Sequence, residues 1–360
     1  MAAAATLRSA IKTLLIRLPN PVGDVVMTTP LLDVLRRELP GVEIVLAGNG
    51  GFGELLAGLD TFDRFLPYPG GRPIAGMSGR QAAAGGTPGN SGRAKPSLRT
   101  QAKWLRQANA DAILLLPNSW SSALVARMAG IRQRIGRRAH GRALLLTHKL
   151  PPVGPARPMT RIYLEMLAPL GIEVPSEANA PRPRLVSGQV EAGFLGVAPG
   201  AAFGESKIYP VEMLAAALEQ VQQNLQLPIQ LIGAPSEQAL LEEVGDELQQ
   251  RNMGFQIAPS GGFGTAKQNI KSCRALLTMD SGARHIAAAL GVPQIAIYGP
   301  THPGWSAHSL DSTTILRAED VDCLGCHHKT CPIDHRCMTR IQPTVVAEAL
   351  ERAALGQSVK

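Results

Sequence analysis

Short apolar runs alternate with longer helical patterns along the first half of the chain. The runs lack the period-two alternation of a half-exposed strand, which is typical of parallel strands buried on both faces of a sheet. The stretches between them have the spacing of amphipathic helices. The expected strands are residues 13–18, 42–48 and 111–117, and the expected helices are residues 25–39 and 121–130.

The same alternation begins again in the second half of the chain. The expected strands there are residues 193–200, 228–235, 273–282 and 293–301, and the expected helices are residues 210–223, 236–251 and 344–355. A polar, Pro-rich stretch at 175–185 separates the two halves and has the composition of an interdomain linker.

Two rounds of β/α alternation in 360 residues predict an α/β fold with two doubly wound, Rossmann-like domains that face a cleft. The expected domains are residues 1–182 and 183–342, followed by a C-terminal helix over 343–360. Residues 70–99 are rich in Gly, Ala, Ser, Pro and Arg and have no periodicity, so we expect a flexible basic loop there.

The net charge of the chain indicates which kind of binding partner to expect. The chain has 36 Lys and Arg against 28 Asp and Glu, a net charge of +8, which favours an anionic partner. Aromatic residues make up only 4%, which does not favour a base-stacking platform. No apolar run approaches the roughly 20 residues of a membrane span, and Arg8, Lys12 and Arg17 interrupt a faintly signal-like N-terminus. We therefore expect a cytoplasmic protein.

Three loops follow expected strands, where ligands bind in doubly wound folds. The first, "PNPVGDVV", places Asp24 directly after Gly23 at the start of a helix. An Asp at this position either caps the helix by accepting its free N–H groups or acts as a general base. The sequence leaves both interpretations open.

The second loop, "APGAAFGESKIYP", covers residues 198–210. Gly200 and Gly204 let backbone N–H groups approach a phosphate, and Lys207 is placed to neutralise its charge. The alternative is a glycine turn with a solvated lysine.

The third loop is "MDSGARHIAAALG", residues 279–291. Asp280 and Ser281 are expected to cap the helix that begins near Gly282, so that its first N–H groups form an anion site. His285 lies on the same face of that helix, one turn further on. Together these residues predict a site for a nucleotide diphosphate.

Several familiar catalytic motifs are missing from the sequence. There is no Walker A sequence and no G-x-G-x-x-G, which disfavours P-loop hydrolases and dinucleotide dehydrogenases. There is also no G-x-S-x-G elbow of an α/β-hydrolase.

Four of the five cysteines stand in "CLGCHHKTCPIDHRC", together with three histidines. Cys323, Cys326, Cys331 and Cys337 have ligand types suited to zinc, although their spacing is compressed for a two-knuckle site. The alternative is a reduced, tightly folded loop. A zinc-containing nucleic-acid-binding protein is thus a second class of function, although scattered arginines and few aromatics weigh against nucleic acid.

The three loops and the Cys-rich tail resemble glycosyltransferase family 9, the lipopolysaccharide heptosyltransferases, and most closely their heptosyltransferase II type. The similar segments span most of the chain. They are "LLIRLPNPVGDVVMTTPLLDVLRRELPGVEI", "LLLPNSWSSALVARMAGIRQRIGRR", "APGAAFGESKIYP", "TMDSGARHIAAALGVPQIAIYGPTHPGW" and "CLGCHHKTCPIDHRCM".

This resemblance implies a GT-B fold. Residues 1–182 would form the acceptor-binding domain, and residues 183–342, with the Cys-rich tail at 323–337, the nucleotide-sugar-binding domain. The helix at 343–360 would cross back to the first domain. The family transfers heptose from ADP-heptose, with inversion, to the lipid A-linked inner core, without a required cofactor, in peripheral contact with the inner face of the cytoplasmic membrane.

The resemblance also implies roles for individual residues. Asp24 would be the general base on the acceptor hydroxyl. The residues implied for the donor nucleotide and its phosphates are Gly200, Ala201, Lys207, Asp280, Ser281, Gly282 and His285. The residues implied for the acceptor are Gly23, Asn118, Ser119, Arg127 and Arg137, and the surrounding basic set also includes Arg132, Arg134, Arg138 and Arg142.

Some positions depart from the family pattern. Ile208 and Tyr209 stand where Arg-Trp is common, and Ala201 and Ala202 provide no hydroxyl in the phosphate loop. A family 9 transferase that uses another nucleotide sugar or cell-surface glycan is therefore the nearest alternative, and a catalytically silent sugar-nucleotide binder is a third.

Overall fold

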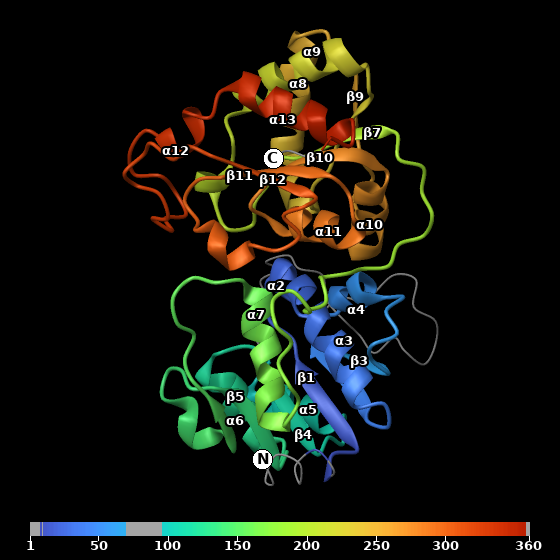
Figure 1. Ribbon diagram of the computed structural model, residues 1–360, viewed down its shortest axis with the longest axis vertical. Coiled ribbons are helices and arrows are strands. Elements are labelled where there is room, and N and C mark those ends of the chain that lie inside the picture. The colour runs from blue at the N-terminus through green and yellow to red at the C-terminus, as the bar shows by residue number, and fades with distance from the viewer. Residues whose placement is uncertain (1–7, 9, 70–95, 358–360) are drawn as a thin grey trace. The chain divides into compact units, whose positions relative to one another are not determined.

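The computed structural model of the chain describes residues 8, 10–69 and 96–357. It divides into two compact units, residues 1–183 and 184–360. Each unit contains one six-stranded sheet with helices packed on it (Figure 1). The expected α/β fold with two doubly wound domains is confirmed.

All strands of the first sheet are parallel. β1 pairs with β2 on one side and with β4 on the other, so the strand order reverses beside β1. The order is β3-β2-β1-β4-β5-β6. The strands are β1 (Thr13–Arg17), β2 (Glu43–Gly48), β3 (Arg64–Pro67), β4 (Ala112–Leu115), β5 (Gln133–Arg137) and β6 (His148–Leu150).

Helices cover both faces of this sheet. Leu15 of β1 belongs to a buried cluster with Trp104 and Ala123 on α5 and α6. Leu14 and Ile16 point to the opposite face, because successive residues of a strand alternate, and they are equally buried. The helices are α2 (Val22–Met27), α3 (Thr29–Glu38), α4 (Gly51–Leu56), α5 (Leu98–Arg106), α6 (Trp120–Met128) and α7 (Met159–Leu164), with 3₁₀ turns η1 (Arg142–Leu145) and η2 (Glu165–Leu170).

The helix expected over residues 25–39 is two helices. α2 ends at Met27 and α3 begins at Thr29, with Pro30 in its first turn. A proline inside one continuous helix would clash with the carbonyl four residues earlier, whereas the first turn accommodates it.

The loop expected over residues 70–99 begins outside the described residues, which resume at residue 96. Residues 98 and 99 already belong to α5. Ser97 caps that helix, because its Oγ accepts a hydrogen bond from the backbone N–H of Thr100.

The second sheet repeats this plan. β10 pairs in parallel with β7 and with β11, so the strand order reverses between β7 and β10. The order is β12-β11-β10-β7-β8-β9. The strands are β7 (Phe194–Ala198), β8 (Ile229–Leu231), β9 (Phe255–Ile257), β10 (Cys273–Met279), β11 (Gln294–Tyr298) and β12 (Thr313–Arg317).

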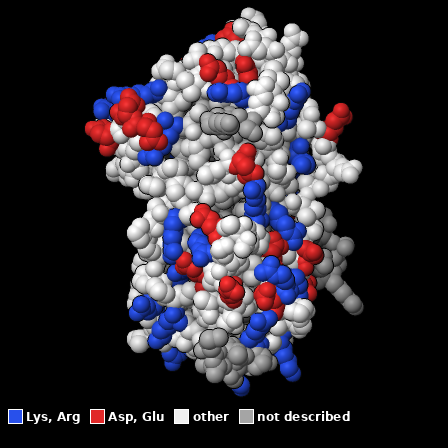
Figure 2. Space-filling view, viewed as in Figure 1, with Lys and Arg blue, Asp and Glu red and all other residues white. Residues whose placement is uncertain are grey.

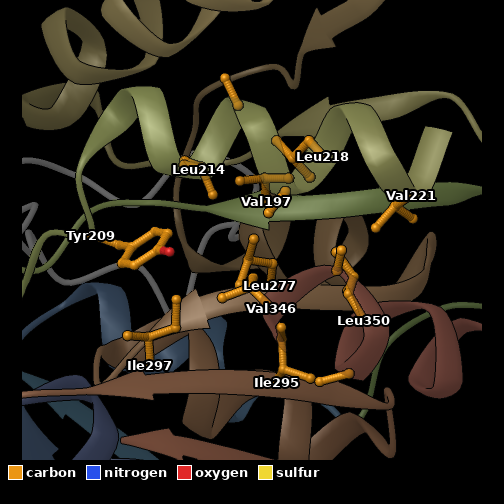
Figure 3. Close-up of a cluster of buried hydrophobic side chains, with 14 of the residues drawn as sticks. Val197, Tyr209, Leu214, Leu218, Val221, Leu277, Ile295, Ile297, Val346 and Leu350 are labelled. Carbon is orange, nitrogen blue, oxygen red and sulfur yellow. The ribbon is translucent and has the colours of Figure 1, made fainter. Parts of the chain in front are cut away.

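One face of the second sheet packs on α8, α9 and α13. Figure 3 shows Leu214 and Leu218 of α8 above Val197 and Leu277 of the sheet, with Tyr209 at one end of the cluster. The helices are α8 (Val211–Leu225), α9 (Gln238–Gln250), α10 (Phe263–Lys271), α11 (Gly282–Leu290), α12 (Arg336–Thr339) and α13 (Pro343–Ala354), with 3₁₀ turns η3 (Glu205–Lys207), η4 (Pro235–Glu237) and η5 (Pro303–Ser306).

The last helix belongs to the second unit. Val346 and Leu350 of α13 are fully buried in the core of that unit (Figure 3), and α13 contacts α8, β10 and β11. The apolar stripe of α13 covers the second sheet. The expected return of residues 343–360 to the first domain stays a prediction.

Charge is divided unevenly between the two units. Residues 1–183 contain 23 of the 36 Lys and Arg and 11 of the 28 Asp and Glu, a net charge of +12, whereas residues 184–360 carry −4. On the face shown in Figure 2, Lys and Arg side chains are spread over the first unit among fewer acidic ones. The excess positive charge of the chain therefore resides in the first unit. Among the described residues, no helix combines the length and the apolar character needed to cross a membrane.

Candidate active site

Each sheet has one point where the strand order reverses, and ligands of doubly wound folds bind beyond the carboxyl ends of the strands there. In the first unit this point lies between β1 and β4, and in the second between β7 and β10. The three loops singled out in the sequence all follow β1, β7 or β10. Sequence position and sheet topology thus indicate the same location for a ligand site in each unit.

The first unit has a cavity of about 330 Å³ at its reversal point. The loops that follow β1 and β4 form part of its wall, and α7 closes another side. Asp24, Asn118, Ser119 and Arg137 all line it, together with Tyr163. The structure therefore brings together four of the six residues assigned to catalysis or the acceptor.

Asp24 is not the N-cap of α2. That position is Pro21, and Asp24 lies in the first turn of the helix. Its carboxylate has no hydrogen bond or ion pair to any other part of the chain that the structure describes, and burial raises its pKa to about 6. An unpaired carboxylate with such a pKa is suited to accept a proton near neutral pH.

Tyr163 is a neighbour of Asp24 that the sequence did not indicate. It is 4% exposed, and burial together with the charge of Asp24 raises the pKa of its hydroxyl well above the usual range. α7 brings it to α2 across more than a hundred residues of sequence. Only the tertiary packing of these helices shows this neighbour.

Arg142 holds the loop after β4 in place. Its guanidinium donates to the carbonyl oxygens of Pro117 (2.5 Å) and Ser119 (3.3 Å), and to Asn118 Oδ1 (3.0 Å). Arg142 is fully buried, which lowers its pKa to about 10. The sequence placed Arg142 among the acceptor-facing arginines, but its hydrogen bonds make it a support for Asn118 and Ser119.

Arg137 is a buried arginine on the cavity wall. Its Nη2 lies 2.5 Å from Glu165 Oε2, and Nη1 donates to the Pro151 carbonyl at 3.1 Å. Its Nε is buried and has no partner in the described part of the chain. One donor of this guanidinium is therefore still available within the wall of the cavity.

Two residues assigned to the acceptor lie apart from the cavity lining. Gly23 is buried inside α2, and Arg127 is an exposed residue of the last turn of α6. The start of α6 is beside the cavity, and seven residues of helix place Arg127 about 10 Å further along its axis. Their roles toward the acceptor stay predictions.

In the second unit, Lys207 and Asp280 join the two loops at the reversal point. Lys207 Nζ lies 2.6 Å from Asp280 Oδ2 and donates to the Asp280 carbonyl at 2.8 Å. Thr301 Oγ1 also donates to Asp280 Oδ2 at 2.6 Å. Lys207 is only 8% exposed, so the pair holds a charged amine at the end of β10.

The expected capping by Asp280 and Ser281 is not what the structure shows. Ser281 occupies the N-cap position of α11, but its side chain makes no capping hydrogen bond. Asp280 uses its carboxylate for Lys207 and Thr301 instead. Without a side-chain cap, the N–H groups that begin at Gly282 retain their capacity for an anion.

Glu237 is a second residue that the sequence analysis did not identify. A Cβ at Gly200 would collide with the Glu237 carboxylate, so this acid lies directly on the phosphate loop. Its Oε2 accepts a hydrogen bond from the Ala234 N–H at 2.8 Å. An acidic residue after the second strand of a mononucleotide-binding half commonly binds ribose hydroxyls, and the position of Glu237 after β8 was the available signal.

The Cys-rich tail supports the phosphate loop from the other side. Ser206, the neighbour of Lys207, donates from its N–H to the Lys329 carbonyl (3.0 Å) and from Oγ to the His328 carbonyl (2.5 Å). His335 Nε2 lies 2.7 Å from the Ser206 carbonyl. A Cβ at Gly204 would collide with the Lys329 carbonyl, so glycine permits this close approach.

The four cysteines of the tail line one small apolar cavity of about 140 Å³ together with His328 and His335. All four are free thiols. No three His, Cys, Asp or Glu side chains within the described ranges are arranged to hold a metal ion. Both interpretations of this segment, a zinc site and a tightly folded loop with reduced cysteines, stay predictions.

His285 is 6% exposed and lies beside Arg284 and His308. The charge of Lys207 is one of the influences that lower its pKa. His285 is therefore a buried, neutral imidazole on α11, and its role toward the donor stays a prediction.

Two doubly wound units, one with an unpaired buried carboxylate and the other with a buried lysine at its reversal point, have the architecture of the GT-B class. The family model of glycosyltransferase family 9 (heptosyltransferase) matches residues 98–336, and the chain belongs to this family.

Individual relatives agree with the family model. Lipooligosaccharide heptosyltransferase 2 of Haemophilus influenzae is 27% identical, over 83% of this chain and 86% of its own. Lipopolysaccharide heptosyltransferase 2 of Escherichia coli is 26% identical, over 94% of this chain and 97% of its own. The solved structure of the Escherichia coli ADP-heptose lps heptosyltransferase II has a TM-score of 0.72 at 24% identity and covers 96% of this chain and 99% of that one. This likeness confirms the GT-B fold.

Proposed function

We propose that this chain transfers heptose from ADP-heptose, with inversion, to the lipid A-linked inner core of lipopolysaccharide. The relatives named above support the sugar and the acceptor. One structural observation carries the proposal: an unpaired Asp24 with a pKa of about 6 lines the cavity at the reversal point of the first sheet. The Lys207–Asp280 pair at the corresponding point of the second sheet supplies the donor site.

The chemistry follows from these two sites. Asp24 takes the proton of the acceptor hydroxyl as its oxygen forms the bond to the anomeric carbon of heptose. The bond to the diphosphate oxygen breaks on the opposite side, and ADP leaves with the electron pair. Attack opposite to the leaving group inverts the anomeric configuration.

The leaving diphosphate gains negative charge as the bond breaks. The N–H groups at the start of α11 and the amine of Lys207 are fixed in place before the reaction, so they stabilise this charge with little reorganisation. Gly200 and Ala201 bring further N–H groups to the same place, and Glu237 is positioned to bind the ribose hydroxyls. We expect transfer to need no added cofactor, because these groups provide the positive charge.

The first unit is suited to an anionic acceptor. Its net charge of +12 favours a phosphorylated, acidic oligosaccharide, and Arg137 and Asn118 line the cavity that holds Asp24. A lipid-linked acceptor would bring the enzyme to the inner face of the cytoplasmic membrane as a peripheral protein.

The donor nucleotide provides the first test. Calorimetric titration of the purified chain in EDTA should show binding of ADP and much weaker binding of UDP and GDP. Lys207→Ala should weaken ADP binding at least tenfold, because a charge-assisted contact is lost. The control is Lys103→Ala, an exposed lysine of α5, which should leave ADP binding unchanged. A preference for UDP or GDP would contradict heptose as the sugar and favour another nucleotide sugar.

A further inference from the structure

Tyr163 differs from the other buried tyrosines of the chain in the state of its hydroxyl. The Tyr209 hydroxyl donates to the Ile341 carbonyl at 2.6 Å. The Tyr298 hydroxyl lies 2.7 Å from Ser306 Oγ. Tyr163 is nearly as enclosed, at 4% exposed, but its hydroxyl has no hydrogen bond to the described part of the chain. A buried tyrosine hydroxyl normally has a partner, so this one is expected to come from outside the chain.

The cavity that contains Asp24 accounts for the unpaired hydroxyl. Tyr163 lines this cavity of about 330 Å³ together with Asp24 and Asn118. Its hydroxyl oxygen is also not among the fully enclosed polar atoms that lack a partner. The small exposed part of Tyr163 therefore includes the hydroxyl, and this part faces the cavity.

Two further polar groups of the cavity lack a partner within the described residues. One is the Asp24 carboxylate. The other is the Nδ2 donor of Asn118, because Asn118 Oδ1 accepts from Arg142 at 3.0 Å and this contact orients the amide. The remaining lining consists mainly of Pro, Leu, Ile and Met side chains. An acceptor atom and two donors in a largely apolar cavity match a sugar that presents several hydroxyls.

The surroundings of Tyr163 keep its hydroxyl protonated. Burial and the charge of Asp24 raise the pKa of this hydroxyl well above its usual range. No hydrogen bond joins it to Asp24, whose own pKa is raised by burial. The tyrosine is therefore available as a donor to a ligand oxygen, and Asp24 remains the group that accepts a proton.

We propose that Tyr163 is an acceptor-binding residue whose hydroxyl donates a hydrogen bond to the acceptor sugar, at the hydroxyl next to the one that Asp24 deprotonates. The proposal rests on the proposed function for the identity of the acceptor site. Contacts to two neighbouring oxygens fix the direction of the attacking hydroxyl, which a single contact with Asp24 leaves free to rotate. Tyr163 thereby favours an acceptor with two adjacent hydroxyls.

Tyr163→Phe tests this hydrogen bond, because it removes the hydroxyl and keeps the buried ring. With ADP-heptose and a lipid A-linked core acceptor, kcat/KM for the acceptor should fall about five- to tenfold, as expected for one hydrogen bond. The KM of ADP-heptose should not change. The decline of kcat/KM below a pH of about 6 should persist, because burial raises the pKa of Asp24. An unchanged kcat/KM, or a shifted pH profile with an unchanged acceptor KM, would overturn the proposal.

Tyr68→Phe is the matched control. Tyr68 belongs to the same unit, packs edge-on against Trp104 and is not part of the cavity lining, so this variant should keep the acceptor kinetics of the unaltered chain.

An altered acceptor tests which oxygen is bound. Replacing the adjacent hydroxyl of the acceptor by hydrogen should cost the unaltered chain about five- to tenfold in kcat/KM and should cost Tyr163→Phe nothing. An equal loss in both chains would show that Tyr163 serves another partner and would overturn the proposal.

A binding measurement separates this proposal from the proposed transfer reaction. The core oligosaccharide released from lipid A can be titrated into the ligand-free chain by calorimetry, without a donor. Binding that is about five- to tenfold weaker in Tyr163→Phe supports the role of Tyr163 even where no heptose is transferred, and the missing transfer then contradicts the proposed function alone. Equal binding by both chains, or no binding by the unaltered chain, would overturn the proposal.

Discussion

At the scale of single residues, the two sites differ in how their charged groups are paired. Lys207 and Asp280 are paired at 2.6 Å, and the amine is thereby held in place. Asp24 has no such partner within the described residues, and its burial raises its pKa. A carboxylate that no cation stabilises is a better proton acceptor.

The first prediction concerns the pH dependence of transfer. Asp24 must be ionised to take a proton, so kcat/KM should fall tenfold per unit as the pH drops below about 6. Initial rates between pH 5 and 8 would give this profile, and ADP binding measured across the same range serves as the control. A rate that stays constant from pH 7 to pH 5 would contradict the role of Asp24.

The second prediction concerns stability. Because the pKa of Asp24 is about 6 in the folded chain and 3.8 without burial, the native state loses stability as the pH rises from about 4 to 6. Asp24→Asn removes this loss. Its free energy of unfolding should exceed that of the unaltered chain by about 3 kcal/mol at pH 7.5.

Urea unfolding at pH 7.5 and pH 4 would measure this difference, which should nearly vanish at the lower pH. An Asn variant that is less stable at pH 7.5 would show that the carboxylate makes a favourable contact instead.

Single residues were predictable where their chemistry depends on local sequence. Asp24, Lys207 and the turn at 280–282 all follow predicted strands. Tyr163 and Arg142 depend on tertiary packing, and the sequence either omitted them or placed them at the wrong face. The sequence alone does not distinguish a buried arginine from an exposed one.

At the scale of elements, the Cys-rich tail and the phosphate loop form one unit of structure. Residues 328, 329 and 335 bond to Ser206, the residue before Lys207. The tail therefore fixes the backbone from which Lys207 projects. The cysteines of the tail suggested binding of a metal or of nucleic acid. Its hydrogen bonds instead indicate that it holds the phosphate loop in position.

The third prediction tests this support. His335→Ala should leave the Ser206 carbonyl without its side-chain partner and weaken ADP binding several-fold, because the loop loses a fixed position. His328→Ala is a matched control, since only the backbone carbonyl of His328 contacts Ser206 and its ring is exposed. The same loss of ADP affinity in both variants would contradict a specific role for His335.

Strands with mostly apolar sequences were predictable, including the three-residue β8, whereas the polar β5 and β6 were not. β1, β2, β4 and β10 match the expected runs, because each is nearly all apolar. β5 has the sequence "QRIGR", which is too polar to be recognised as a strand. Arg137 of this strand is nevertheless buried. The last helix was predicted from its apolar face, which packs on the second sheet.

At the scale of the whole molecule, the two units carry net charges of opposite sign. The first unit, at +12, carries the candidate acceptor cavity, and the second, at −4, carries the proposed donor site, which consists of a few fixed groups. Long-range attraction should therefore act mainly on the acceptor. Local hydrogen bonds should determine the affinity for the donor.

The fourth prediction follows from this separation. Raising the salt concentration from 50 to 300 mM should increase the KM of a phosphorylated acceptor several-fold, because exposed charges are screened beyond about 10 Å. The KM of ADP-heptose should change much less, since Lys207 is buried. Steady-state kinetics with each substrate varied in turn would show the contrast, and equal salt dependence would count against it.

The most direct measurement of the central claim is a transfer assay with the purified chain, ADP-heptose and a lipid A-linked core acceptor in the presence of EDTA. Mass spectrometry of the acceptor and release of ADP would be followed together. We predict the addition of one heptose with inverted linkage, and a loss of at least about a hundredfold in Asp24→Asn. No transfer by a chain that binds ADP, or equal turnover by the Asn variant, would contradict the account.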